Sequence, residues 1–169
     1  MIVGGEPLAS IDTSIEEITR DAERRSARAG MERLDAWRRD HRGEVCEFAS
    51  ATYESPAGLF SVAFTPDFGV RVGRREIAVH VWNTINPPLQ PHLVSLALSL
   101  FPPLYEGAST PDDLAVLSLR DSEFYRLSEA GARADEGEAL ATRIDELIRD
   151  VRDELGLPDA DEHPPGPRA

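Results

Sequence analysis

The chain has 169 residues and a formal net charge of −13, and all 18 of its basic residues are arginine. A hydrophobic content of 41% and a mean hydropathy of −0.34 are typical of a soluble globular protein, not of a disordered chain. The acidic balance argues against a general nucleic-acid coat and against binding to anionic membranes. The single cysteine, Cys46, excludes an internal disulfide and a cysteine-cluster metal site.

The ends of the chain differ in composition from its middle. We expect a flexible arm over residues 1–11, one domain over 12–156, and a disordered acidic, proline-rich tail over 157–169. We expect no signal peptide among the first residues, and the most apolar run, Leu93 to Phe101, is about half the length needed to span a bilayer. These features predict a cytoplasmic protein without membrane contact.

The first half of the domain combines one helix with short strands. A thin apolar stripe predicts a long helix over about residues 14–41. From Val45 the apolar residues alternate, which predicts four strands joined by tight turns, near 45–53, 60–64, 68–72 and 77–81.

The second half is expected to be mainly helical. Residues 92–101 are apolar nearly all round, which predicts a short buried helix. The segment 111–119 fits both a helix and a strand, and a short helix is expected from Ser122 to about Ala130. Apolar residues at helical spacing predict a long helix over about 135–155.

The predicted fold class is α+β. We expect a four-stranded antiparallel meander with one covering helix, flanked by the long N- and C-terminal helices. The predicted core combines one strand face with the covering helix, and its members are Phe60, Val62, Phe64, Val79, Val81, Leu96 and Leu100.

The sequence contains no catalytic motif. The four histidines are scattered over different elements without metal-ligand spacing, and no nucleophile elbow, phosphate-binding loop or dinucleotide fingerprint is present. Cys46 shares a strand face with Phe48, which favours a buried structural thiol over a nucleophile. We therefore predict no catalytic residue, no metal site and no cofactor.

Positive charge is concentrated in the N-terminal helix. Residues 20–42 contain eight arginines and five acids, whereas residues 135–162 contain eleven acids and three arginines. Arginines at helical spacing can follow a phosphate backbone. The candidate nucleic-acid contacts are Arg24, Arg25, Arg28, Arg38, Arg39 and Arg42. Alternatively, the arginines pair with acids of their own helix and of the acidic C-terminal helix.

Part of the chain resembles a known family. A long polar helix followed by the segment from Ala49 to Phe64, and then by Phe68-Gly69-Val70, resembles the YbaB/EbfC family of small nucleoid-associated proteins. In that family a helix precedes a hairpin with this pattern of Ala, Thr, Ser, Gly and alternating apolar residues. The resemblance covers about residues 12–101 and implies a homodimer whose helices contact DNA. The arm at 73–82 and the region 104–156 depart from the short family members.

Two function classes follow, with an enzyme of unknown type as the third. The first is a homodimeric, DNA-associated module that uses the arginine-rich helix. The second is an acidic protein-binding adaptor or secretion-type chaperone, whose sheet and acidic helix receive a partner polypeptide. In both cases we expect a homo-oligomer.

Overall fold

The computed structural model describes residues 14–84, 86, 88–107, 110–131 and 133–157. The expected arm at 1–11 lies outside the described residues. The expected tail at 157–169 also lies outside them, except for Leu157. The described elements, in chain order, are α2 (Asp21–Asp40), β1 (Glu44–Cys46), β2 (Ala51–Glu54), β3 (Ser61–Phe64), β4 (Phe68–Val72), β5 (Arg75–Trp82), α3 (Pro91–Leu98), the 3₁₀ turn η1 (Pro102–Leu104), β6 (Asp113–Ser118), β7 (Phe124–Arg126), α4 (Leu127–Ala130) and α5 (Ala134–Glu154).

Five strands form the main sheet, in the order β1-β4-β5-β6-β7. All neighbours are antiparallel except β5 and β6, which run parallel, with Ile77 opposite Asp113 and Trp82 opposite Ser118. A parallel pair needs a crossover connection, and α3 lies in this one. The mixed α+β class is therefore confirmed.

The sheet differs from the predicted four-stranded meander. The ambiguous segment 111–119 forms the central strand β6, whose six residues are all buried. The expected helix from Ser122 is instead β7 followed by the single turn α4. The expected strand 45–53 is divided, because β1 pairs with β4 whereas β2 and β3 form a separate hairpin.

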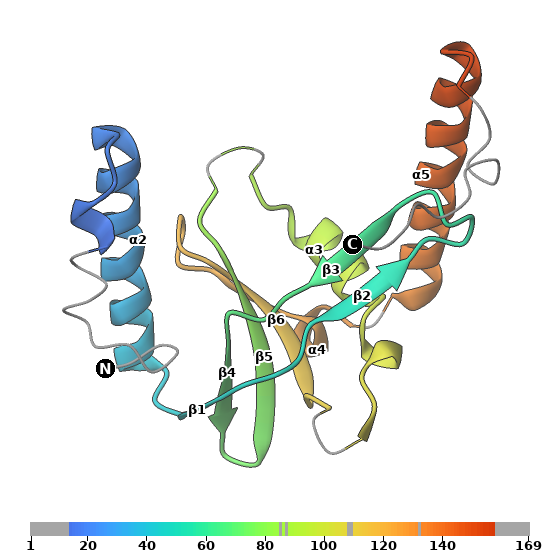
Figure 1. Ribbon diagram of the computed structural model, residues 1–169. Helices are drawn as coiled ribbons and strands as arrows, with labels where there is room; N and C mark the ends of the chain where they lie inside the picture. The colour runs from blue at the N-terminus through green and yellow to red at the C-terminus, as the bar shows by residue number, and fades with distance from the viewer. Residues whose placement is uncertain (1–13, 85, 87, 108–109, 132, 158–169) are drawn as a thin grey trace, which may run out of the picture.

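Helices cover both faces of the main sheet. α2 packs one face through Leu34 and Trp37, which contact the strand cluster that includes Val79 and Leu117. α3 and the hairpin β2–β3 cover the other face, where the buried residues include Phe64. Figure 1 shows α2 and α5 on opposite sides of the molecule. Successive residues of β6 belong to the two clusters in turn, since side chains of a strand alternate between its faces.

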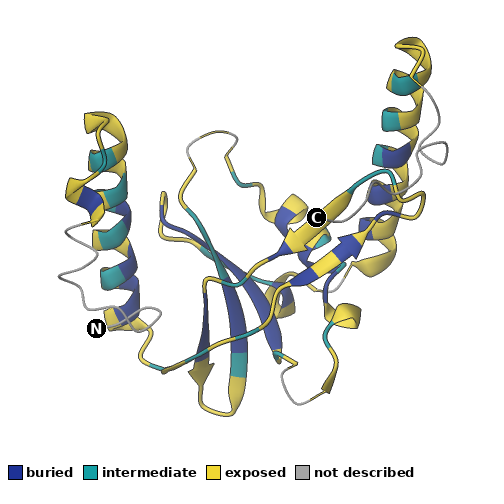
Figure 2. Ribbon diagram, viewed as in Figure 1, coloured by how far each residue is buried: buried dark blue, intermediate teal, exposed yellow. Residues whose placement is uncertain are grey.

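The predicted core is only partly correct. Phe64 is buried with α3, but Val79 lies on the α2 face, and Val62 is 40% exposed. α3 buries Val94 and Leu98 against the sheet. Leu96 and Leu100 are half-buried and lie beside α5. Figure 2 shows that the buried positions are concentrated where the two layers meet the sheet.

The hairpin β2–β3 is held against α5 by polar contacts. Asp145 is 2% exposed, and its carboxylate accepts hydrogen bonds from Ser55 Oγ at 2.7 Å and from the Ala57 N–H at 2.8 Å. Tyr53 donates its hydroxyl proton to Glu138 Oε2 at 2.7 Å. Burial and the bond to Glu138 raise the pKa of Tyr53 to about 12. The hairpin therefore lies along the N-terminal half of α5, the inner half of this helix.

α5 approaches α3 closely at Gly137. A side chain at this position would meet the backbone oxygen of Leu96 at 2.9 Å and the side chain of Leu100 at 3.1 Å. Glycine thus permits the contact between the two helices, although it lowers intrinsic helix propensity. Within the described part of the chain, no helix combines the length and the apolar character needed to cross a membrane.

Candidate functional site

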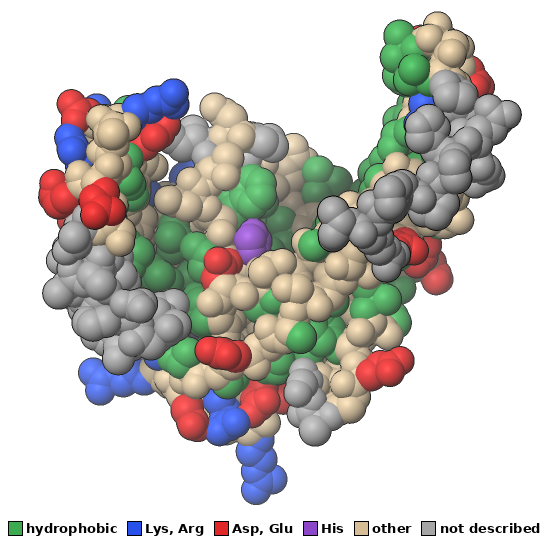
Figure 3. All heavy atoms as spheres, in the orientation of Figure 1, with side chains coloured by type: hydrophobic (Ala, Val, Ile, Leu, Met, Phe, Trp, Pro, Cys, Tyr) green, Lys and Arg blue, Asp and Glu red, His purple; other side chains and the backbone are tan. Residues whose placement is uncertain are grey.

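Three of the six candidate arginines form ion pairs with acids of the N-terminal segment. Arg24 forms an ion pair with Asp21, Arg28 with Glu16, and Arg39 with Asp35. The pairs of Arg24 and Arg39 are i, i+3 and i, i+4 pairs on one face of α2, whereas Glu16, the partner of Arg28, lies before α2. Figure 3 shows acidic and basic side chains intermixed along α2.

Arg38 has a structural position. It is 6% exposed, and its guanidinium donates hydrogen bonds to the carbonyl oxygens of His41 at 3.2 Å and Gly43 at 3.1 Å. These carbonyls lie just beyond the end of α2, where the helix dipole favours a cation. The side chain caps the helix and is not available to an external phosphate.

Arg25 and Arg42 are exposed and form no ion pair with the other described residues. They are separated by almost the whole of α2, or about 25 Å at a rise of 1.5 Å per residue. Two isolated charges at this distance do not form a continuous path for a phosphate backbone. The structure therefore does not gather the six candidates into one basic surface.

The acidic C-terminal helix does not pair with these arginines within one chain. α2 and α5 lie on opposite sides of the sheet, and no ion pair joins the two helices among the described residues. The expectation that these arginines also pair with acids of the C-terminal helix is therefore wrong within one chain. Arg24 and Arg39 pair with acids of α2, and Arg28 pairs with Glu16 just before this helix.

One histidine is paired with a carboxylate. His80 Nδ1 lies 3.0 Å from Asp67 Oδ2 and 3.1 Å from the carbonyl oxygen of Thr65. The bond to Asp67 is the main reason why the pKa of His80 is raised. Burial acts to raise the pKa of Asp67, but hydrogen bonds from His80 and from the Val81 N–H outweigh it and lower that pKa. In the described chain, neither partner of His80 is a hydroxyl or thiol nucleophile.

Cys46 is half-buried, and burial together with the charge of Glu76 raises the pKa of its thiol. A thiol of raised pKa is a poor nucleophile at neutral pH. In the described residues, no group of three or more histidine, cysteine, aspartate or glutamate side chains is placed to hold a metal ion.

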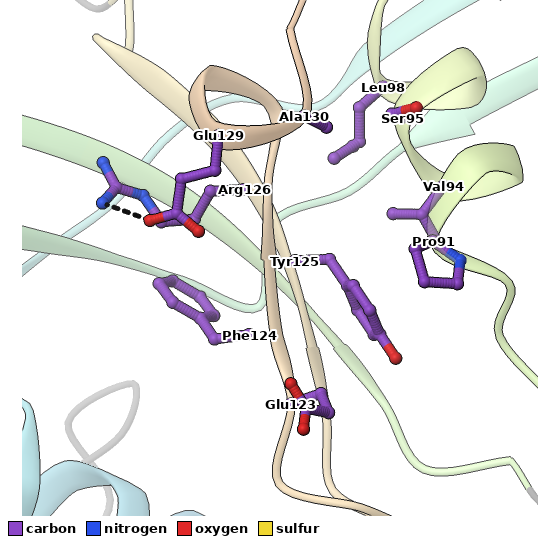
Figure 4. Close-up of a pocket in the computed structure, with 10 residues that line it drawn as sticks. All are labelled: Pro91, Val94, Ser95, Leu98, Glu123, Phe124, Tyr125, Arg126, Glu129 and Ala130. Atoms are coloured by element: carbon purple, nitrogen blue, oxygen red, sulfur yellow. Dashed lines mark hydrogen bonds and ion pairs between the residues drawn. The ribbon is translucent and has the colours of Figure 1, made fainter.

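A groove lies beside the edge strand β7 and has a volume of about 280 Å³. One wall is α3 and the other is β7 with α4. Figure 4 shows Tyr125 directed toward the α3 residues Pro91 and Val94, whereas Phe124 and Arg126 point to the opposite side. The residues that line the groove are Pro91, Val94, Ser95, Leu98, Glu123, Phe124, Tyr125, Arg126, Glu129 and Ala130.

The backbone of β7 presents polar groups along this edge. The Ser118 N–H donates to the Glu123 carbonyl at 2.9 Å. Because bonded and non-bonded pairs alternate in an antiparallel ladder, Val116 and Tyr125 form the next bonded pair. The backbone N–H groups of Phe124 and Arg126 therefore point away from β6, toward the free edge of the sheet. The carbonyl of Phe124 points toward the same free edge. No described strand pairs with this side of β7.

The two sheet faces differ along the same edge. Phe124 contacts Trp37 and His41 on the α2 side, with ring centroids 5.1 Å and 6.1 Å apart. Tyr125 packs against the core on the α3 side, where burial and the charges of Asp121 and Glu123 raise its pKa. Each face thus offers aromatic surface to a segment placed beside β7.

The charges of the groove are mainly acidic. Arg126 is held by the buried carboxylate of Asp113, with N–O distances of 2.9 and 3.0 Å, and also contacts Glu129 at 3.2 Å. Its charge is therefore already compensated. Glu123 and Glu129 give the rim of the groove a negative balance.

Sequence reasoning missed this groove. The segment that forms β7 was expected to be helical, so the edge strand and its free backbone groups could not be anticipated. The available signal was the pair Phe124-Tyr125, since adjacent aromatic residues are typical of strands that present both faces to apolar surroundings.

Comparison with protein-family models, with curated proteins and with solved structures finds no match to this chain. The resemblance to the YbaB/EbfC family therefore stays a prediction.

Proposed function

We propose that the protein is a non-enzymatic binding module for an extended polypeptide segment, in the manner of an adaptor or a secretion-type chaperone. The observation that carries this proposal is the edge of β7, where outward-directed backbone groups border an open groove. A segment that adds to a sheet edge gains main-chain hydrogen bonds, and its alternate side chains enter pockets on the two faces.

The groove defines the chemistry of the segment. Every second side chain would contact Val94, Leu98 and Tyr125, which favours apolar residues at these positions. The side chains between them would face Phe124, whose ring packs on the buried Trp37. The acidic rim favours a basic residue close to Glu123. DNA is less well supported, because the candidate arginines are paired, buried or far apart, and the net charge is −13.

Selection from a phage-displayed library of random peptides on the full chain tests the proposal. We expect enrichment of peptides with alternating apolar residues, whose affinities are then measured by fluorescence anisotropy. Ala130→Arg places a long side chain in the groove from an exposed position on α4. This change should weaken peptide binding by about tenfold or more, equivalent to about 1.4 kcal/mol.

Ala134→Arg is the matched control, because Ala134 is also exposed but lies at the start of α5, outside the groove. It adds the same charge and should leave peptide affinity unchanged. Failure to enrich any peptide, or equal losses in both variants, would refute the groove as the binding site. Binding of random duplex DNA in place of peptides would favour the nucleoid hypothesis.

A further inference from the structure

The C-terminal half of α5, its outer half, exposes an apolar stripe. Beyond the contacts of Asp145 with the hairpin, the exposed fractions are 47% for Leu147, 51% for Val151 and 67% for Leu155. Figure 3 shows hydrophobic side chains along the length of this helix. In Figure 1 its outer turns extend away from the sheet. A row of large apolar residues at such exposure indicates an interaction surface.

The spacing of the stripe is that of a helix–helix contact. Leu140, Ile144, Leu147 and Val151 follow one another at intervals of four, three and four residues. This is the a/d spacing of a coiled coil, in which every position of the seam is apolar. The seam thus has the pattern expected for packing against another helix.

A hollow of about 110 Å³ lies at the inner end of the stripe. All of its lining residues are apolar except Gly137, and they come from the hairpin, α3 and α5. Phe60 and Val62 form one side, whereas Leu140 and Ile144 form another. An apolar cavity of about 150 Å³ can hold a benzene ring, so this smaller hollow has room for a single aliphatic side chain.

We propose that the stripe binds the same stripe of a second copy, with the two α5 helices antiparallel. Leu147 of each copy then lies near the two-fold axis. In an antiparallel pair each a residue packs beside a d residue. Leu147 of the second copy therefore packs beside Ile144, and Val151 of the second copy packs beside Leu140, over the hollow. A two-fold contact is self-complementary, so each copy covers the hollow of the other.

The charges along the seam favour this orientation. Arg143 is the only base on its flank, where the other charged side chains are Glu136, Asp150 and Glu154. In the antiparallel arrangement Arg143 faces Asp150 of the second copy, and the pair occurs twice. Asp150 forms no ion pair with the other described residues. Arg143 contacts Glu146 of its own helix at 2.8 Å, and this exposed partner would be exchanged for or shared with Asp150 of the second copy. Flanking charges of this kind set the orientation of paired helices.

The parallel arrangement lacks this complementarity. It would bring Arg143 beside the apolar Ile148 of the second copy, and Asp150 beside Leu155. It would also align the acidic ends of two helices whose residues 134–157 contain eight acids and three arginines. The antiparallel dimer separates these ends.

The proposed contact is small. The stripe from Leu140 to Leu155 is about 22 Å long and one helix wide. Stable interfaces bury about 800 Å² per partner, so this one lies at the lower end of the range. We therefore expect dimerisation in the micromolar range and a monomer at high dilution.

Sedimentation equilibrium of the full chain tests the contact. The wild type should approach twice the mass of 18.6 kDa at high micromolar concentration. Leu147→Glu should give a monomer, because it places two carboxylates at the axis. Leu93→Glu is the matched control, since Leu93 is similarly exposed, at 44%, but lies on α3. It should leave the dimer intact; a monomeric wild type, or equal effects of both changes, would overturn the proposal.

A charge exchange tests the orientation. Arg143→Asp and Asp150→Arg should each weaken the dimer, because each change places like charges opposite one another. A mixture of the two variants should dimerise again, since every contact between unlike copies is then complementary. Absence of recovery in the mixture would exclude the antiparallel arrangement. These changes lie outside the groove beside β7, so this proposal can fail without affecting the proposed function.

Discussion

At the scale of single residues, the pair of His80 and Asp67 is the feature that responds to pH. Its Nδ1–Oδ2 distance is 3.0 Å, and it joins β5 to the segment just before β4. The same carboxylate also accepts the Val81 N–H at 2.7 Å. The pair therefore fixes the local path of the chain at the start of the β4–β5 hairpin.

We expect this pair to stabilise the fold most at mildly acidic pH. The folded pKa of His80 is raised above its usual 6.5, so its contribution is complete below that value and is lost as the pH rises through the folded pKa. The folded pKa of Asp67 is lowered, so its contribution is lost only when the pH falls below its usual 3.8.

The measurement is the free energy of unfolding of the wild type and of His80→Gln between about pH 5 and pH 9. The wild type should be the more stable at the acidic end, and the difference should shrink as the pH rises. Both side chains are more than a third exposed, so screening keeps the effect below about 1 kcal/mol. A difference that grows with pH would contradict the assignment.

At the scale of elements, the docking of the hairpin β2–β3 on α5 depends on Asp145. This carboxylate is buried, and it accepts one hydrogen bond from a hydroxyl and one from a backbone N–H. Hydrogen bonds to a charged group contribute about 1.5–3 kcal/mol, and their loss would leave the Ala57 N–H unpaired.

Asp145→Ala should therefore lower the free energy of unfolding by about 2–4 kcal/mol, as measured by chemical denaturation. It should also increase hydrogen exchange at Ala57, because the turn is released from the helix. Asp153→Ala is the control on the same helix, and we expect a change within about 0.5 kcal/mol for this exposed position away from the seam. Equal stability of both variants would show that the hairpin docks by its apolar contacts alone.

Some elements could be predicted from local pattern alone. The alternation at 68–72 and 77–81, with Gly73 between them, identified β4 and β5. Apolar residues at helical spacing identified α5, and α2 begins at Asp21, seven residues later than expected. In these cases one face of the element is apolar and the other is polar. The apolar residues therefore recur in the sequence with the period of a strand or of a helix.

Other elements lacked such a period. β6 is buried on both faces, and a continuous apolar run does not distinguish a strand from a helix. The chain leaves the main sheet between Cys46 and Ala51 without a glycine or proline to mark the change. The parallel pairing of β5 and β6, and with it the groove beside β7, depends on contacts between distant segments. Local sequence patterns could not supply these contacts.

At the scale of the whole molecule, the sheet separates two surfaces of different character. α2 lies on one face and carries intermixed charges, whereas α3, the hairpin and α5 build apolar surfaces on the other. The proposed sites for a polypeptide and for a second copy involve different elements of the latter face, at β7 and α5. One molecule could therefore hold its partner while remaining dimeric.

The final prediction concerns the arginine-rich helix as a test of DNA binding. Wild-type protein should not shift duplex DNA in a mobility assay at about 50 mM salt, where phosphate contacts are strong. A triple change of Arg24, Arg28 and Arg39 to Glu removes three ion pairs and places like charges together. We expect it to lower the free energy of unfolding by about 1–2 kcal/mol.

The matched control changes Arg25 and Arg42 to Glu, since these exposed arginines have no ion pair among the described residues. Its stability should remain within about 0.5 kcal/mol of the wild type. Thermal melts of the three proteins beside the mobility assay separate the two roles of the helix. The opposite outcome is a wild-type protein that shifts DNA, with a weaker shift in both folded variants. This result would show that the helix binds DNA, because unpaired and paired arginines would then both contact phosphate.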